Sequence, residues 1–275
     1  MRKVIAFSLL FLFLVSLKIP ASDFARDRII RHVERHSCAI GVYYHMDEQE
    51  YLRRMAIFSK HSTPYKVEPI GEGKEGEYII AYVGSGGVIP GNGVLTASHL
   101  FDHSYNTYKM EIWVYLRTDK KKIVRYSAEI VCKTNLDHNP WRDYAVLYVQ
   151  EDLKLPGLKL AKKEPRWGDR VIWSGSMSGF MYVMRGDHLG FMKDFFLRNE
   201  TGYLSIRCWV DHPLYRISPG APGDSGSMLL NKKGEILSVI CWGINLSDQH
   251  CYLLANPLSM LRGYLAEEDF LRLWE

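Results

Sequence analysis

Short runs of apolar or alternating residues follow one another along most of the chain. A first series begins at 38–46, resumes at residue 78 and ends near residue 149, and a second extends from residue 170 to residue 257. Turn-forming or charged residues separate the runs at intervals of roughly ten residues, a spacing typical of short antiparallel strands. The pattern predicts an all-β fold of two six-stranded antiparallel β-barrels, the first over about 38–155 and the second over about 160–257.

Two segments at the ends of these series have the spacing of short amphipathic helices. The apolar positions of 23–36 and of 258–275 recur three or four residues apart, so each segment places them on one helical face. These positions are Phe24, Ile29, Ile30 and Val33 in the first segment and Leu258, Leu261, Leu265 and Phe270 in the second. The charged segment 47–75 is broken by prolines and glycines and is interpreted as an elaborated connection, for which the pattern specifies no structure.

The first 22 residues differ from the rest of the chain. Arg2 and Lys3 precede the apolar run 4–17, and small and turn-forming residues follow it. This order is typical of a secretory signal peptide over residues 1–22, cleaved near its end. The run is shorter than the roughly 20 residues of a spanning helix, and an uncleaved anchor through residues 4–17 stays open as the alternative. We expect a secreted or periplasmic protein, or one tethered to a membrane, with residues 23–275 as a single domain.

The net charge of the mature chain argues against one class of partner. Without the first 22 residues the formal charge falls from +4 to +1, because that segment contains three basic residues and no acidic one. A nearly neutral chain has no long-range attraction for nucleic acid, so no such partner is expected.

Five cysteines are present, and an odd number leaves at least one thiol without a partner in the same chain. They are Cys38, Cys132, Cys208, Cys241 and Cys251. A disulfide between Cys241 and Cys251 would close a hairpin, whereas the alternative interpretation is that these residues are small buried hydrophobes. The chain contains no CxxC pair and no HExxH motif, so neither a metal site nor another cofactor is predicted.

The segment "APGDSGS" at 221–227 is composed almost entirely of small or turn-forming residues. Gly223 and Gly226 flank Ser225 closely enough to permit a sharp turn, which can direct the amides of Gly223 and Ser225 into one small space. Two such donors can bind the oxyanion of a tetrahedral intermediate, and the serine can attack if a base activates it. A plain surface turn is the alternative interpretation of the same residues.

A histidine and an acid occur in settings that suit this chemistry. His99 follows the strand-like "GVLTAS", and a base at the end of a strand is held firmly enough to meet a hydroxyl. The alternative role for His99 is a hydrogen bond to the backbone. Asp143 opens the apolar run "DYAVLYV", where a carboxylate is costly to bury unless it has a partner. An acid placed there can orient the histidine.

The motifs "GSGGVIPGNGVLTASHL", "DYAVLYV" and "GDSGS", in that order, resemble the trypsin-like serine proteases of the chymotrypsin fold, most closely the bacterial and viral branches. The resemblance covers roughly residues 80–257 and implies a serine endopeptidase that cleaves a polypeptide substrate. It implies that Ser225 is the nucleophile, His99 the general base and Asp143 the orienting acid. It also implies that the amides of Gly223 and Ser225 form the oxyanion hole, and that Cys241, Trp242 and Gly243 line the primary substrate pocket.

The chain departs from the family pattern at several positions. Leu100 stands where many members have a cysteine, which removes a usual disulfide. No Ile-Val-Gly-Gly stretch precedes the first barrel, so Asp224 lacks the freed N-terminus that pairs with the corresponding acid in digestive members. We therefore expect activity without an activating cleavage. In family members that cleave after Arg or Lys, an acid six residues before the serine sets this specificity. Pro219 stands at that position here, and its uncharged surroundings predict a small or apolar pocket.

Overall fold

The computed structural model describes residues 21–60, 78–101, 107, 109–118, 122–135, 142–166, 169–177, 180–192, 203–209, 223–247 and 250–274. The predicted signal peptide lies almost wholly outside these residues, as does Pro219. Among the described helices, none is long and apolar enough to span a bilayer.

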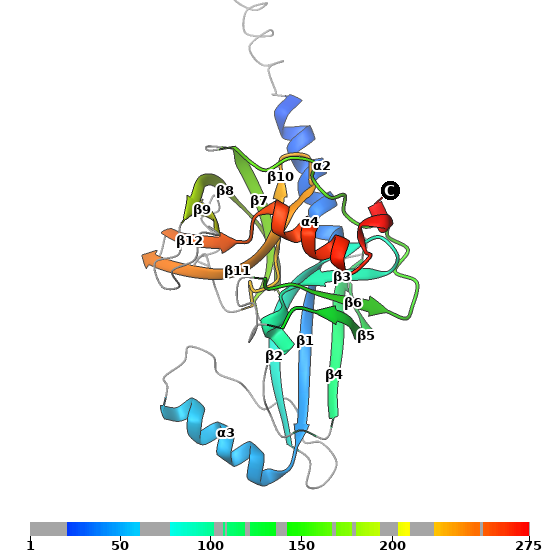
Figure 1. The fold of residues 1–275 in the computed structure, drawn as a ribbon, viewed down its shortest axis with the longest axis vertical. Helices are drawn as coiled ribbons and strands as arrows, with labels where there is room; N and C mark the ends of the chain where they lie inside the picture. Colours follow the sequence, from blue (N-terminus) through cyan, green and yellow to red (C-terminus); the bar gives the residue numbers. More distant parts are fainter. Residues whose placement is uncertain are drawn as a thin grey trace, which may run out of the picture.

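Strands β1 to β6 form a closed six-stranded antiparallel barrel with the hydrogen-bonded order β1-β2-β3-β6-β5-β4 (Figure 1). The barrel closes because β1 pairs with both β2 and β4. Along β4, Ile112, Val114 and Leu116 are buried while the residues between them are more exposed, which is the alternation expected of a barrel wall. The strands are β1 Ser37–Met46, β2 Tyr78–Ile89, β3 Gly93–Thr96, β4 Lys109–Arg117, β5 Ile123–Lys133 and β6 Ala145–Val149.

Six further antiparallel strands make up the second half of the chain. Their hydrogen-bonded order is β10-β11-β12-β9-β8-β7, and β10 also pairs with β7. The strands are β7 Arg170–Met177, β8 Phe180–Met192, β9 Tyr203–Trp209, β10 Met228–Asn231, β11 Ile236–Ser247 and β12 His250–Ala255. The all-β class predicted from the sequence is confirmed.

Helices occur at both ends of the strand series and in one connection. Helix α2, Ala21–His36, precedes β1, and its Val33 is fully buried, as the 23–36 pattern predicted. Helix α4, Leu258–Glu267, ends earlier than the 258–275 pattern suggested. Asp269 has a positive φ of 59°, which a right-handed helix does not accommodate, and a 3-10 turn, η2 Leu271–Trp274, follows.

Helix α3, Glu48–Lys60, lies within the connection for which the sequence pattern specified no structure. The side chain of Asp47 accepts a hydrogen bond from the Glu50 amide (2.8 Å) and so caps the first turn. Glu50 in turn pairs with Arg53 (2.7 Å) and Arg54 (2.6 Å), one helical turn away. The charged residues that resembled a loop therefore stabilise a helix, which extends from the far end of the barrel in Figure 1.

One hydrophobic cluster joins the two halves. It contains Leu95 and Val146 from β3 and β6 together with Trp173 and Leu229 from β7 and β10, all fully or almost fully buried. Leu261 of α4 packs into the same cluster, so the C-terminal helix helps to hold the halves together. This shared core fixes the ends of β2, β3 and β6 relative to β10 and β11.

Candidate active site

His99 lies in a short 3-10 turn, η1 Ser98–Phe101, directly after strand β3. Thr96, Ala97 and Ser98 are fully buried, so the backbone that leads to His99 is enclosed by the barrel. The Ser98 hydroxyl donates to the carbonyl of Thr134 (2.7 Å) and ties the turn to the end of β5. The His99 side chain remains 31% exposed, which leaves part of the ring accessible to a substrate.

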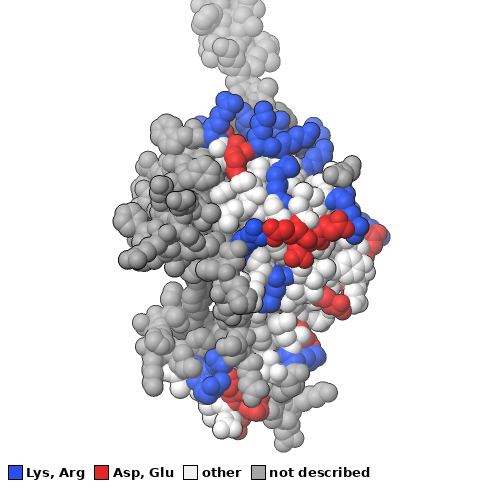
Figure 2. All heavy atoms as spheres, in the orientation of Figure 1, with Lys and Arg blue, Asp and Glu red and all other residues white. Residues whose placement is uncertain are grey.

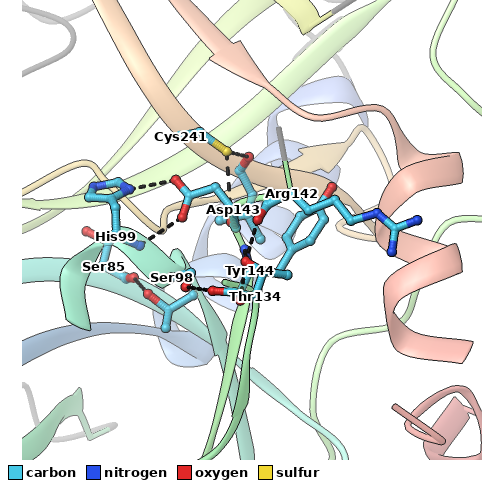
Figure 3. Close-up of polar contacts among 10 residues, drawn as sticks. Ser85, Ser98, His99, Thr134, Arg142, Asp143, Tyr144 and Cys241 are labelled. Carbon is cyan, nitrogen blue, oxygen red and sulfur yellow. Dashed lines mark hydrogen bonds and ion pairs between the residues drawn. The ribbon is translucent and has the colours of Figure 1, made fainter. Parts of the chain in front are cut away.

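Asp143 receives two hydrogen bonds from His99 (Figure 3). The His99 amide donates to Oδ1 (2.9 Å), and ring atom Nδ1 lies 2.6 Å from Oδ2. Asp143 is only 3% exposed, so these contacts compensate for the burial of its carboxylate. A neutral imidazole that donates from Nδ1 presents Nε2 as a proton acceptor, which is the tautomer a general base requires.

The backbone around Asp143 is held by Thr134. The Thr134 hydroxyl donates to the carbonyl of Arg142 and lies 3.2 Å from the amide of Tyr144, which donates to it. The Thr134 amide also donates to the Tyr144 carbonyl (2.9 Å). One side chain thus fixes the residues on both sides of the acid. The sequence analysis did not single out Thr134, because no local pattern relates it to Asp143.

Residues 223–227, here called the nucleophile loop, form a tight turn in which the Ser227 amide donates to the Asp224 carbonyl (2.9 Å). The Gly226 amide donates to the carbonyl of Ile240 (2.9 Å), and the Ile240 amide donates back to Ser227 (2.9 Å). These bonds attach the loop to strand β11. Ser225 at its centre is partly exposed, whereas Asp224 is 4% exposed.

The loop is attached to the first barrel through Ser85 of strand β2. The Ser85 amide donates to the carbonyl of Ser225 (2.8 Å), and the Ser85 hydroxyl donates to the carbonyl of Gly223 (2.6 Å). The carbonyl of Ser85 accepts a hydrogen bond from Thr96 Oγ1 (2.7 Å), three residues before His99. The strand end that carries the histidine and the loop that carries Ser225 therefore contact the same residue.

Gly226 is required where the loop meets the barrel. Its φ of +87° is a conformation that other residues rarely adopt. A Cβ at this position would lie 2.1 Å from the Ser85 carbonyl oxygen and 2.3 Å from Thr96 Oγ1. The second glycine of the motif thus permits the close approach of the loop to β2.

The amides proposed from the sequence as an oxyanion hole belong to this loop. Gly223 has a φ of +102°, which bends the backbone before Ser225. Within the described part of the chain, no residue accepts a hydrogen bond from the amide of Gly223 or of Ser225.

Cys241 lies beside the acid and not in a disulfide. Its thiol is free and 3% exposed, with Sγ 3.4 Å from the Val239 carbonyl oxygen and 4.0 Å from that of Asp143. Burial, followed by the negative charge of Asp143, raises the pKa of the Cys241 thiol well above its ordinary value. Of the two interpretations that the sequence left open, the small buried hydrophobe is confirmed for Cys241, and the Cys241–Cys251 disulfide is wrong. Strands β11 and β12 pair Cys251 with Asn245.

The remaining predicted pocket residues are placed only in part. The backbones of Trp242 and Gly243 lie in β11, opposite Leu254 and Leu253 of β12. Pro219 lies outside the described residues. In the described part of the chain, no group of three or more His, Cys, Asp or Glu side chains is arranged to hold a metal ion.

The sequence profile of the trypsin-like peptidase domain matches residues 84–239, which is more than half of the chain. The chain belongs to the trypsin-like peptidase family. This match confirms the family resemblance and the serine-peptidase class that the order of the three motifs predicted. It covers the second half of β2 from residue 84, together with His99, Asp143 and the nucleophile loop.

Solved structures of bacterial and HtrA-type proteases share the fold at low sequence identity. The inactive form of the Rv3671c protease has 17% identity and a TM-score of 0.55, with 90% of this chain and 95% of that chain covered. The active form, from M. tuberculosis, has 18% identity and a TM-score of 0.55, with 90% and 86% covered. The HtrA-type protease AlgW, solved with a decapeptide, has 14% identity and a TM-score of 0.59, with 87% and 66% covered. No sequence in the curated set of proteins matches the chain significantly.

Proposed function

We propose that this trypsin-like peptidase is an exported serine endopeptidase that uses Ser225, His99 and Asp143 as its catalytic triad. The observation that carries the proposal is the pair of hydrogen bonds from His99 to the buried Asp143 carboxylate. A buried acid bound to Nδ1 leaves Nε2 to accept a proton, as a base for a serine requires. The contact of the nucleophile loop with Ser85, which also binds Thr96 near His99, supports Ser225 as the partner.

The reaction that we propose proceeds in two acyl-transfer steps. Ser225 Oγ attacks the peptide carbonyl carbon while His99 accepts the hydroxyl proton, and the amides of Gly223 and Ser225 bind the oxygen that becomes negative. His99 then gives the proton to the leaving amine as the C–N bond breaks, which leaves an acyl-enzyme. Water attacks the ester, His99 accepts a proton from it, and the proton returns to Ser225 as the acid product leaves.

The substrate is proposed to be an extended polypeptide bound beside β11. AlgW was solved with a decapeptide. An extended peptide can add to the edge of a β-strand through main-chain hydrogen bonds, and β11 is the strand that we propose for this contact. We infer that strands β7–β12 close as the second barrel of a chymotrypsin-like double barrel. Cys241, Trp242 and Gly243 then line the primary pocket together with Pro219, and the pocket accepts small or apolar side chains.

Export and activation are further parts of the proposal. The basic start and apolar run 4–17 support a signal peptide or a membrane tether. Lys and Arg side chains gather at the end of the molecule where α2 begins (Figure 2), and a basic surface there suits an anionic membrane beside a tether. We also propose that the enzyme is active without cleavage between residues 23 and 80, because no Ile-Val-Gly-Gly stretch precedes the first barrel.

A fluorophosphonate probe tests the triad without knowledge of the natural substrate. We expect the folded full-length protein to form a covalent adduct on Ser225 that peptide mass spectrometry locates, and Ser225→Ala to form none. The second candidate function is a peptide-binding module without catalysis, which the shared fold alone would also permit. A folded wild-type protein that binds peptides but forms no adduct would favour the binding module over the peptidase.

A further inference from the structure

Ser85 makes two hydrogen bonds that connect the first barrel to the nucleophile loop. Its amide and its hydroxyl donate to the carbonyls of Ser225 (2.8 Å) and Gly223 (2.6 Å), which lie on either side of Asp224. Ser85 is 1% exposed, so both bonds are shielded from water. We propose that the Ser85 hydroxyl is a positioning group that sets the direction of the Ser225 amide in the oxyanion hole and the attack geometry of Ser225.

The geometry of the peptide bond explains how a carbonyl contact acts on the amides. Each peptide group is planar, so a carbonyl held in place also fixes the direction of the amide across the same C–N bond. Through its two hydrogen bonds, Ser85 holds two peptide groups, the one between Gly223 and Asp224 and the one between Ser225 and Gly226. The peptide group between these two contains the Ser225 amide. The attacking hydroxyl is attached through Cβ to the Ser225 Cα, which lies next to the second held group. Both groups are therefore constrained by contacts with a single serine.

Ser85 itself is rigidly held. It lies inside β2, where it is opposite Ala39 of β1, and its carbonyl accepts the hydrogen bond of the buried Thr96 hydroxyl. A donor that is fixed before the reaction costs no reorganisation when charge develops on the substrate oxygen. In the described part of the chain, no other donor reaches the Gly223 carbonyl, so the loss of the Ser85 hydroxyl would leave it without a described partner.

This inference rests on the proposed nucleophile and deepens it. The bond to the Ser225 carbonyl comes from the Ser85 backbone amide, which alanine keeps, so Ser85→Ala isolates the bond to Gly223. We expect the maximal rate of fluorophosphonate labelling at saturating probe to fall roughly ten- to a hundredfold, as expected for one lost hydrogen bond to a buried carbonyl. The probe concentration that gives half of the maximal labelling rate should change by no more than about twofold, because the lost contact acts in the chemical step.

A matched control separates positioning from folding. Ser37 is also buried, at 3% exposed. Its hydroxyl donates to the Val33 carbonyl (2.7 Å) and contacts the Ser174 hydroxyl, and it has no described contact to the nucleophile loop. Ser37→Ala should lower thermal stability at least as much as Ser85→Ala but leave the labelling rate unchanged. Ser85→Thr keeps a hydroxyl donor and should restore most of the rate. The pH at which labelling is half-maximal should be the same in Ser85→Ala as in the wild type, because the His99–Asp143 contact is untouched.

The outcomes distinguish this inference from the proposed function. If Ser225→Ala is still labelled at its wild-type rate, the triad assignment fails. If Ser225→Ala is inert but Ser85→Ala reacts as fast as the wild type, the triad stands and the positioning role of Ser85 is refuted. Should Ser85→Ala not fold, Ser85→Cys carries the test, since a thiol of similar size is a much weaker hydrogen-bond donor to the Gly223 carbonyl. A normal labelling rate in folded Ser85→Cys would then overturn the inference.

Discussion

The substitution Gly226→Ala should destabilise the protein strongly, because the nucleophile loop lies closest to the first barrel at this residue. The new Cβ would lie 2.1 Å from the Ser85 carbonyl oxygen, 2.3 Å from Thr96 Oγ1 and 3.1 Å from the Ala97 nitrogen. The first two distances are shorter than nonbonded atoms allow, and one of those atoms is backbone inside β2, so the loop must move away.

Two costs add in this variant. A non-glycine residue held at a φ of +87° costs about 1–3 kcal/mol, and overpacking of a filled interior typically costs about 1–3 kcal/mol more. We therefore expect the free energy of unfolding to fall by about 2–6 kcal/mol. Urea unfolding followed by tryptophan fluorescence measures this as a lower midpoint at unchanged slope.

Two other glycines provide matched controls. Gly263 lies in helix α4, and a Cβ added there would have no atom within 4 Å, so Gly263→Ala should raise stability by about 0.5–1 kcal/mol. Gly234 has a φ of +78°, but the nearest neighbour of an added Cβ is the His32 ring carbon at 3.1 Å, which can rotate away. Gly234→Ala therefore isolates the dihedral cost. If Gly226→Ala and Gly234→Ala have the same urea midpoint, the close contact of residue 226 with Ser85 and Thr96 is refuted.

Two further predictions concern the acid and the buried thiols. Asp143→Asn should lower the rate of labelling on Ser225 by about 10⁴-fold while the protein stays folded, because the asparagine amide favours the wrong histidine tautomer. The rate is measured by stopping the probe incubation at set times. A rate within about tenfold of the wild type would contradict the triad. Burial raises the pKa of the Cys38 and Cys241 thiols, so the folded state keeps protons that the unfolded thiols lose above their ordinary value of about 9.0. The stability that the two buried neutral thiols provide is therefore fully present below pH 9. Above it, the free energy of unfolding falls by roughly 1 kcal/mol per thiol over the next pH unit. Urea midpoints should fall less steeply with alkaline pH in Cys38→Ala than in the wild type.

The contact between His99 and Asp143 could be anticipated from the sequence because each residue lies at a strand boundary with its own local signal. His99 follows the buried end of β3, and Asp143 precedes β6, which pairs with β3. Antiparallel pairing places the end of one strand beside the start of the other. The sequence did not predict this pairing, and the contact was expected from the motif order through the resemblance to the family.

The role of Ser85 could not be deduced in the same way. Its hydroxyl bonds to a residue 138 positions away, and the contact depends on how the two halves pack. The local signal was the run of glycines around Ser85, which indicates a close backbone approach but does not name its partner. Thr134 was missed for the same reason, since its contacts with Arg142 and Tyr144 require the pairing of β5 with β6.

The geometry of β11 and β12 decides between the two interpretations of Cys241 that the sequence left open. Ten residues separate Cys241 from Cys251 around a turn, which made a hairpin disulfide plausible from spacing alone. A disulfide needs Cα atoms no more than about 7 Å apart. The observed register places Ala255 and Leu254 near Cys241 and shifts between Ile240 and Trp242, which identifies Cys241 as the extra residue of a bulge. Cys241 therefore packs beside Asp143, where its neutral thiol adds no charge near the acid.

The contacts of Ser85 and Gly226 connect stability to catalysis in this peptidase. The proposed base and its acid belong to the first barrel, whereas the proposed nucleophile belongs to a loop bonded to β11. Motion between the halves would change the position of Ser225 relative to His99, and a displacement of about 1 Å can cost roughly a hundredfold in rate. The loop prevents this motion because it is bonded on one side to Ile240 and on the other to Ser85. A substitution that loosens the Ser85 contact should therefore lower the rate before it unfolds the protein, whereas one that forces the loop away, such as Gly226→Ala, should affect both together.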